Sequence, residues 1–334
     1  MFLYFHYFLI NNLPLLISME KTSPLISIVI PSRANSLDLL DELFWCFEKQ
    51  TVKDFEVVVV CDRDFEKKEW EEFLNYFSGL SFSCRFLSHF NSSFIPHSKW
   101  GASYVRNFWI DNAKWEYIQL LDDDNQIDED YLEKVLKYHK EYLKIYKTEV
   151  FITPTLLWRN TTTIQNQWFE WYNYRQARPM IHFLSEGKEC WEIKMFSGNW
   201  IFWKADIMRK VRYDEEIAWI AEDLDFVYSI REKGYPILVF RDLVVHHQER
   251  DKTLLEQAWI WNKKSAQQKI RNIFLWTKKH ADICEKLIVL LWSSWWICWW
   301  LSIKACLYWW DKKIEIVEGL WSWYFQWWKA FLGK

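Results

Sequence analysis

The sequence predicts an α/β fold in which a mostly parallel sheet is flanked by helices and followed by a helical C-terminal region. Short apolar runs rich in β-branched residues, which are typical of buried strands, alternate with stretches of helical apolar spacing. Such alternation indicates right-handed βαβ units and a parallel sheet. After residue 250 the pattern becomes helical and unusually aromatic.

The first half of the pattern begins with a buried strand at 26–31, an apolar run that ends in Pro. A helix is expected at 36–50 because its apolar residues recur at helical spacing. The run 55–60 contains four valines and predicts a second buried strand. The same patterns predict an acidic and aromatic helix at 66–77, a strand at 82–88, a helix at 101–113 and a strand at 116–121.

The second half continues with a helix at 128–146 and a strand at 149–158. Residues 159–195 are aromatic and are expected to be irregular. A further helix is expected at 221–233, and the last strand at 236–240. Ligands of such sheets bind at the carboxyl ends of the strands, so functional residues are expected just after each strand.

Three parts of the chain are therefore expected: an apolar leader at 1–23, the α/β domain at 24–250 and the helical region at 251–334. The leader lacks a basic start and a small-residue cleavage site, and polar residues and a proline interrupt it. We expect translation to start at Met19, with a membrane anchor as the alternative.

Composition excludes two classes of protein. The net charge is −3 and the basic residues are scattered, so no nucleic-acid partner is expected. None of the 7 cysteines forms a C-x-x-C pair, which argues against a disulfide framework or a zinc knuckle. A reducing compartment, the cytoplasm, fits this cysteine usage best.

The strongest chemical signal is a run of three carboxylates, Asp122, Asp123 and Asp124, directly after the strand at 116–121. Adjacent carboxylates repel one another, so the cluster must be exposed or neutralised by a cation. A solvated acidic turn is the alternative, but the position at a strand end favours a ligand site. Oxygen ligands of this kind suit Mg²⁺ or Mn²⁺.

Three weaker signals lie at comparable places. Asp62 follows the second strand, where surface turns also often carry Asp. Glu222 and Asp223 open an expected helix, where the helix dipole alone favours acids, so a general base is only one interpretation. His246 and His247 lie just past the last expected strand and could contact a metal or phosphate.

These residues resemble a known family. The stretches 27–64, 101–125 and 196–237 are similar to the family 2 glycosyltransferases of the inverting GT-A type, particularly bacterial rhamnosyltransferase-like members. The three acidic motifs occur in the family's order and approximate spacing, and the similarity runs from about residue 25 to 250. The resemblance implies a Rossmann-like GT-A fold and sugar transfer from a nucleoside-diphosphate sugar.

The resemblance also implies roles for single residues. Pro31 lines the nucleotide pocket and Asp62 contacts the base, although Cys61 replaces the family's usual first Asp. The triplet matches the D-x-D element, in which Asp122 or Asp123 contacts the ribose and Asp124 binds the metal. The remaining roles fall to the general base Asp223 beside Glu222, to His246 or His247 near the diphosphate, and to Arg106 with Asn107 near the phosphates.

Two further functions stay open. A sugar nucleotidyltransferase has a similar sheet, but the loop after the first strand contains no Gly to cradle phosphates. A nucleotide-sugar-binding protein without transfer activity would also carry these motifs, and donor hydrolysis would separate the two. A membrane-anchored interaction protein would require the acidic motifs to be accidental.

The C-terminal region contains an uncharged run, 287–303, at the short limit for a spanning helix. Serines and a cysteine interrupt it and lysines flank it, which favours peripheral association with the cytoplasmic membrane surface over spanning or burial. By similarity to family members with such tails, the acceptor is expected to be a glycan or polyprenol-linked glycan, walled by residues 159–195.

The composition also has an anomaly. Gly occurs 7 times, where average usage would give about 23, and Trp occurs 26 times. Trp100, Trp109, Trp115, Trp200 and Trp203 stand where the resembled family commonly has Gly. We therefore predict that the gene comes from a genetic code in which UGA encodes glycine, and that the printed sequence translates UGA as Trp. Many Trp would then be Gly in the natural protein, at positions that need φ > 0 or close backbone approach.

Overall fold

The computed structural model describes residues 25–33, 37–95, 102–164, 168–173, 175, 178–181, 187–196, 200–217, 222–247, 263–308 and 313–331. The leader, Trp100 and the boundary expected after residue 250 lie outside the described residues. So do the loop positions 34 and 35 and residues 197–199 before Trp200.

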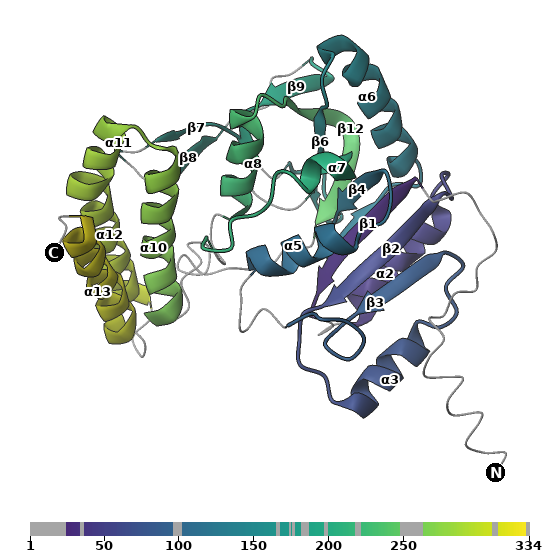
Figure 1. Ribbon diagram of the computed structural model, residues 1–334, viewed down its shortest axis with the longest axis horizontal. Helices are drawn as coiled ribbons and strands as arrows, with labels where there is room; N and C mark the ends of the chain where they lie inside the picture. The colour runs from purple at the N-terminus through teal and green to yellow at the C-terminus, as the bar shows by residue number, and fades with distance from the viewer. Residues whose placement is uncertain are drawn as a thin grey trace.

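A mixed sheet forms the centre of the part that precedes the C-terminal helices (Figure 1). Among the described residues, its strands run in the order β3-β2-β1-β4-β11-β6-β12-β5, and β9 pairs with β12. Its strands are β1 (Ile26–Ser32), β2 (Phe55–Cys61), β3 (Ser83–Leu87), β4 (Tyr117–Leu120), β5 (Asn125–Ile127), β6 (Phe151–Trp158), β9 (Cys190–Ile193), β11 (Phe202–Lys204) and β12 (Ile237–His247).

Parallel pairing aligns the strand ends that carry the acidic motifs. β1 lies between β2 and β4 and is parallel to both. Ser32 is opposite Cys61 at the end of β1 and β2, and Val29 is opposite Leu120 at the end of β4. The residues that follow these strands therefore meet at one edge of the sheet.

Helices cover both faces of the sheet. Alternation along β1 sends Ile26, Ile28 and Ile30 to the core beneath α2, α3 and α6, and Val29 to the core beneath α5, α7 and α8. The helices of this part are α2 (Leu37–Lys49), α3 (Lys67–Tyr76), α5 (Ala102–Asn112), α6 (Tyr131–Tyr146), α7 (Ala205–Met208) and α8 (Glu222–Glu232). The α/β fold with a mostly parallel sheet is confirmed.

The expectation that residues 159–195 are irregular was wrong in part. It contains β9 of the main sheet, and β7 (Trp168–Asn173) and β8 (Arg178–Ile181) form a second small sheet with β10 (Met195–Phe196). The last strand also extends beyond its expected end, through an irregularity after Phe240. His246 and His247 therefore lie inside β12 and not past it.

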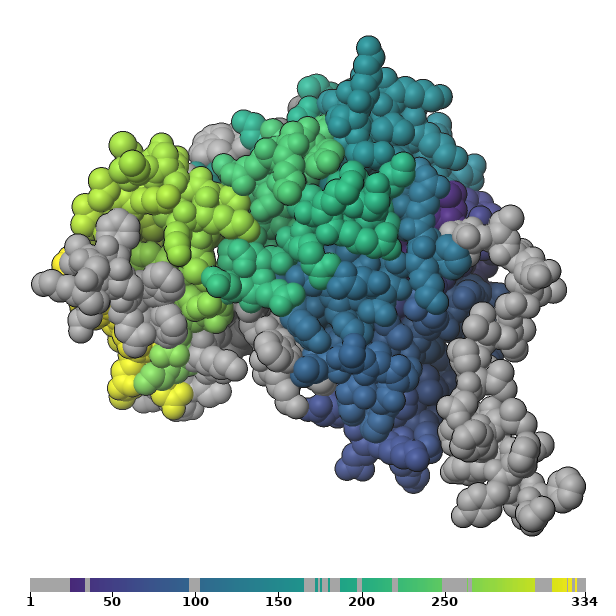
Figure 2. All heavy atoms as spheres, viewed as in Figure 1, coloured from purple at the N-terminus to yellow at the C-terminus, as the bar shows by residue number. Residues whose placement is uncertain are grey.

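The C-terminal helices form a bundle beside the sheet domain, on the side of α8 (Figures 1 and 2). Its elements are α10 (Lys263–His280), α11 (Ile283–Ile288), a π-helical turn η1 (Val289–Ser293), α12 (Ser294–Tyr308) and α13 (Lys313–Phe331). A Cβ at Gly319 of α13 would lie 2.7 Å from the Lys263 carbonyl oxygen of α10, so these helices pack closely. Asp282 and Glu285 form a capping box that begins α11.

The outward face of this bundle is apolar. Val289, Leu290 and Cys298 pack inside the bundle, while the opposite side of the same helix is exposed. The exposed side chains are Leu287, Leu291, Trp292, Trp295, Trp296, Trp299 and Trp300. Among the described residues, one continuous helical stretch, Ile283–Ile303, has the length and hydropathy needed to cross a membrane.

Several tryptophans occupy unusual places in the α/β domain. Trp109 and Trp203 are 1% and 0% exposed. Their indole nitrogens, and that of Trp115, have no hydrogen-bond partner among the described residues, although buried indoles usually find one. None of these three tryptophans has a positive φ, since the described non-glycine residues with positive φ are Lys147 and Asn160. The expectation that these positions need Gly for a left-handed backbone was therefore wrong.

We expect peptide mass spectrometry of the protein from its natural source to find Gly at positions 109 and 115. Replacing a buried indole by Gly removes an unsatisfied N–H group, and the skewed composition gives an independent reason to expect the exchange. Trp in both peptides, or UGG codons at these positions, would refute the recoding.

Candidate active site

The carboxyl ends of β1, β2 and β4 bring three sequence motifs together. The Ser32 hydroxyl donates a 2.7 Å hydrogen bond to Oδ2 of Asp123, and the Asp62 amide donates to the Ser32 carbonyl at 2.6 Å. Asp62 is 8% exposed. Pro31 precedes Ser32 in β1, opposite Val60, and thus lies at the same edge. Ser32, Asp62 and Asp123 thus form a polar rim at this edge of the sheet, with Pro31 beside it.

Cys61 brings a neutral group to this rim. Burial raises the pKa of its thiol, and the nearby Asp123 carboxylate adds to the effect. The side chain is fully buried at the end of β2. A thiol at this place avoids a further negative charge beside the acidic triplet.

The last residue of the triplet faces the end of β12. Oδ2 of Asp124 lies 3.5 Å from Nε2 of His247, and Asp124 is 7% exposed. The adjacent Asn125 fixes the turn, since its side-chain oxygen accepts from the Asp122 amide at 2.7 Å and from the Trp200 indole at 2.8 Å. Asp124 is thereby held beside a histidine that comes from a strand far away in the sequence.

The two neighbouring histidines do not share a role. Side chains alternate along a strand, so His246 faces away from His247. Nε2 of His246 lies 3.8 Å from Asp128, and this contact lowers the pKa of Asp128. The structure thus pairs His247, and not His246, with the triplet.

A buried ion pair fixes the start of α8. Nη1 of Arg106 in α5 lies 2.5 Å from Oε1 of Glu222, and both side chains are nearly fully buried. Burial by itself lowers the pKa of Arg106, but the Glu222 carboxylate outweighs it and raises the pKa, so the guanidinium stays charged. Glu222 is therefore a structural partner of α5, whereas Oδ1 of the adjacent Asp223 accepts a 2.8 Å hydrogen bond from the Leu224 amide.

Tyr213 links the two acidic motifs. Its ring stacks on Phe226 of α8 at 4.0 Å, and its backbone amide donates to Asn107 of α5. Burial raises the pKa of Tyr213, and the charges of Asp223, Glu222 and Asp122 raise it further. Tyr213 thus packs between α5 and α8, and the charges of both acidic motifs act on it.

A divalent ion at this site would need coordinating oxygens from a bound nucleotide in addition to protein side chains. No group of three potential metal-binding side chains occurs in the portion of the chain that the structure describes. Asp124 and His247 supply two donors of suitable chemistry at 3.5 Å. Diphosphate oxygens of a bound donor would have to complete the coordination.

Sequence reasoning missed Ser32, Asn125 and Trp200. Ser32 was seen only as part of a loop without Gly, and Asn125 as the residue after the triplet. Ser32 bonds to Asp123, 91 residues away, and Trp200 bonds to Asn125, 75 residues away. Asn125 also accepts from the amide of Asp122 in its own turn. All three lie within the stretches that carry the resemblance, but the resemblance gave none of them a role in the site.

The fold and this edge of carboxylates define a nucleotide-sugar enzyme of the GT-A class. Residues 27–204, more than half of the chain, match the model of glycosyl transferase family 2. The chain therefore belongs to glycosyl transferase family 2 and is a glycosyltransferase. No curated protein sequence matches it.

Two solved structures illustrate the shared fold. TarS residues 1–349 of S. aureus in complex with UDP-GlcNAc gives a TM-score of 0.51 at 16% identity, covering 80% of this chain and 70% of that one. GalNAc-T7 with UDP, GalNAc and Mn²⁺ gives a TM-score of 0.56 at 15% identity. That match covers 79% of this chain and 50% of GalNAc-T7.

Proposed function

We propose that this glycosyltransferase moves a sugar from a UDP-sugar to an acceptor hydroxyl, with inversion at the anomeric carbon. The observation that carries the proposal is the hydrogen-bonded cluster of Ser32, Asp62 and Asp123 at the ends of β1, β2 and β4, with Asp124 beside His247, in a chain that belongs to glycosyl transferase family 2. Structural relatives crystallised with UDP and UDP-GlcNAc support a UDP-linked donor.

The residues divide the reaction between them. Asp62, Asp123 and Ser32 bind the nucleoside at the ends of β1, β2 and β4. Asp124 and His247 would hold Mg²⁺ or Mn²⁺ against the diphosphate, and the ion would neutralise the charge that develops on the leaving group. Asp223 takes the proton of the acceptor hydroxyl as its oxygen bonds to the anomeric carbon and the sugar–phosphate bond breaks. Attack opposite the leaving group gives inversion.

A donor panel tests the proposal. UDP-linked hexoses, including UDP-GlcNAc, and a nucleotide-linked deoxyhexose are each incubated with the protein, with and without Mn²⁺, and free nucleoside diphosphate is measured. We expect Mn²⁺-dependent release of UDP. Release from the deoxyhexose donor alone would instead favour the rhamnosyltransferase-like specificity that the resemblance implies. Donor binding without release from any donor would support the binding-only alternative.

We further propose that the acceptor is a glycan or polyprenol-linked glycan at the cytoplasmic face of a membrane. The exposed apolar side of Ile283–Ile303 supports this, because Leu287 and Leu291 on it are suited to the interface between headgroups and acyl chains, whichever of the neighbouring tryptophans are Gly in the natural protein. The inward side of the same helix packs in the bundle, which favours a peripheral position over a span.

The full-length protein is expected to bind sedimented vesicles of anionic lipid and to be released by carbonate or high salt. A Leu287→Ser/Leu291→Ser variant removes two exposed apolar side chains from this side, so binding is expected to fall. Tyr76→Ser, which changes an exposed aromatic ring in the α/β domain, is the control. Protein that stays entirely in the pellet after carbonate washing would favour a spanning helix.

A further inference from the structure

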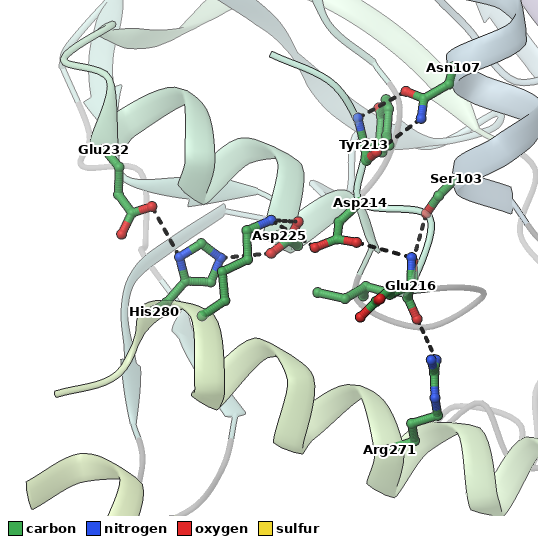
Figure 3. A network of polar contacts seen from close by, with 11 residues as sticks. Ser103, Asn107, Tyr213, Asp214, Glu216, Asp225, Glu232, Arg271 and His280 are labelled. Atoms are coloured by element: carbon green, nitrogen blue, oxygen red, sulfur yellow. Dashed lines mark hydrogen bonds and ion pairs between the residues drawn. The ribbon is translucent and has the colours of Figure 1, made fainter. Parts of the chain in front are cut away.

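The last turn of α10 makes a buried polar contact with the first turn of α8 (Figure 3). Nζ of Lys279 lies 2.8 Å from Oδ2 of Asp225, and Nε2 of His280 lies 2.7 Å from Oδ1 of the same carboxylate. The Asp225 side chain is 0% exposed. Both oxygens of a buried carboxylate in the α/β domain are thus bound by residues of the C-terminal bundle.

His280 extends the contact along α8. Its Nδ1 lies 3.1 Å from Oε2 of Glu232, two helical turns beyond Asp225, and its side chain is 0% exposed. The ring is enclosed by Tyr228 of α8 and Trp276 of α10, at centroid distances of 4.6 and 5.2 Å. The His280 imidazole therefore contacts residues of both the first and the last turn of α8.

The segment before α8 is fastened in the same way. Lys279 also lies 3.2 Å from Asp214, and Arg271 of α10 donates to the Glu216 carbonyl. On the other side, Asn107 and Ser103 of α5 bond to the backbone of residues 213 and 217 (Figure 3). Residues 213–217 are therefore held between α5 and α10.

Helical geometry relates this contact to the proposed base. Residues two apart are about 200° apart around a helix axis, so Asp225 and Asp223 lie on opposite faces of α8. Asp225 faces the bundle, and Asp223 faces away from it. Any shift of α8 that loosens Asp225 also displaces Asp223.

The charges favour one arrangement of α10 against α8. A buried carboxylate is costly unless it is paired, so Asp225 favours the arrangement in which Lys279 and His280 are docked. Burial by itself lowers the pKa of Lys279, but its bonds to Asp225 and Asp214 outweigh burial and raise it. The ammonium group therefore remains charged at neutral pH.

We propose that Asp225, Lys279 and His280 are positioning residues through which the C-terminal bundle sets the placement of α8 and hence of Asp223. The inference rests on the proposed function, because it assigns the role of base to Asp223. It makes the bundle a part of the catalytic apparatus in addition to its membrane surface.

The test uses the full-length protein with His280→Ala, the conservative His280→Gln, and Lys278→Ala as the control. Gln places an amide nitrogen near the position of Nε2 and can still donate to Asp225, whereas Lys278 is an exposed neighbour in the same turn. Two readouts are taken: hydrogen exchange of the α8 amides, and UDP release from UDP-GlcNAc with Mn²⁺.

His280→Ala is expected to speed exchange in α8 and to lower kcat by about tenfold or more, since small misplacements of a catalytic group are costly. KM for UDP-GlcNAc is expected to change less than twofold, because the residues proposed to bind the donor lie at the ends of β1, β2, β4 and β12 and not on α8. His280→Gln should restore most of kcat, and Lys278→Ala should match the parent protein.

Unchanged α8 exchange in a folded His280→Ala protein would overturn the proposal. A rise in KM with unchanged kcat, or an equal loss of kcat in His280→Gln, would overturn it as well. If the parent protein releases no UDP from any donor, the proposed function fails, while the exchange comparison of His280→Ala with Lys278→Ala still decides whether the bundle holds α8.

Discussion

The Asp223→Asn protein is expected to bind UDP as tightly as the parent protein and to lose roughly 10²–10⁴-fold in turnover, the usual scale of general acid–base help. The amide cannot accept the proton of the acceptor hydroxyl, while the donor contacts on β1, β2 and β4 are untouched. Calorimetric titration with UDP and Mn²⁺, followed by initial rates of UDP release, measures both quantities.

Glu222→Gln provides the matched comparison. It makes the same change one residue earlier, but in a carboxylate that is buried against Arg106 at 2.5 Å. Leaving that guanidinium without its partner charge is expected to cost about 3 kcal/mol of unfolding free energy. Its turnover at low temperature should exceed that of Asp223→Asn. If Glu222→Gln is inactive and Asp223→Asn is active, the base is Glu222.

The sheet could be predicted where single strands are buried on both faces. β1, β2 and β6 are long apolar runs, and their pattern is visible without knowledge of their partners. β5 and β11 have three residues each, too few to show a period. They exist because β12 and β4 offer edges for antiparallel pairing, and that pairing is set by contacts distant in sequence.

The candidate site, like the sheet, could be predicted from the sequence only in part. Asp62 and the triplet follow predicted strands, so their meeting at one sheet edge could be inferred. The choice between His246 and His247 could not, because it depends on the register of β12 against β5 and on its irregularity after Phe240. The contact of His280 with Asp225 joins residues 55 apart and has no sequence pattern at all.

The Asp124→Asn protein is expected to lose metal-dependent binding of UDP while it keeps its fold. Asp124 and His247 are the side chains proposed to hold the ion, and an amide oxygen carries no charge to attract it. Removing one charge from a repulsive triplet should leave the unfolding temperature of the ligand-free protein unchanged or slightly raised.

Asp128→Asn is the matched control for this last change, because it also converts a carboxylate beside a histidine, His246, but lies outside the triplet. Calorimetric titrations with UDP, in Mn²⁺ and in EDTA, compare the two variants with the parent protein. Binding to Asp128→Asn should remain Mn²⁺-dependent, and binding to Asp124→Asn should be weak in both conditions. Full affinity of Asp124→Asn in Mn²⁺ would show that Asp124 is not needed to hold the ion. Undiminished UDP release by the parent protein in EDTA would show that the donor diphosphate is neutralised by side chains alone.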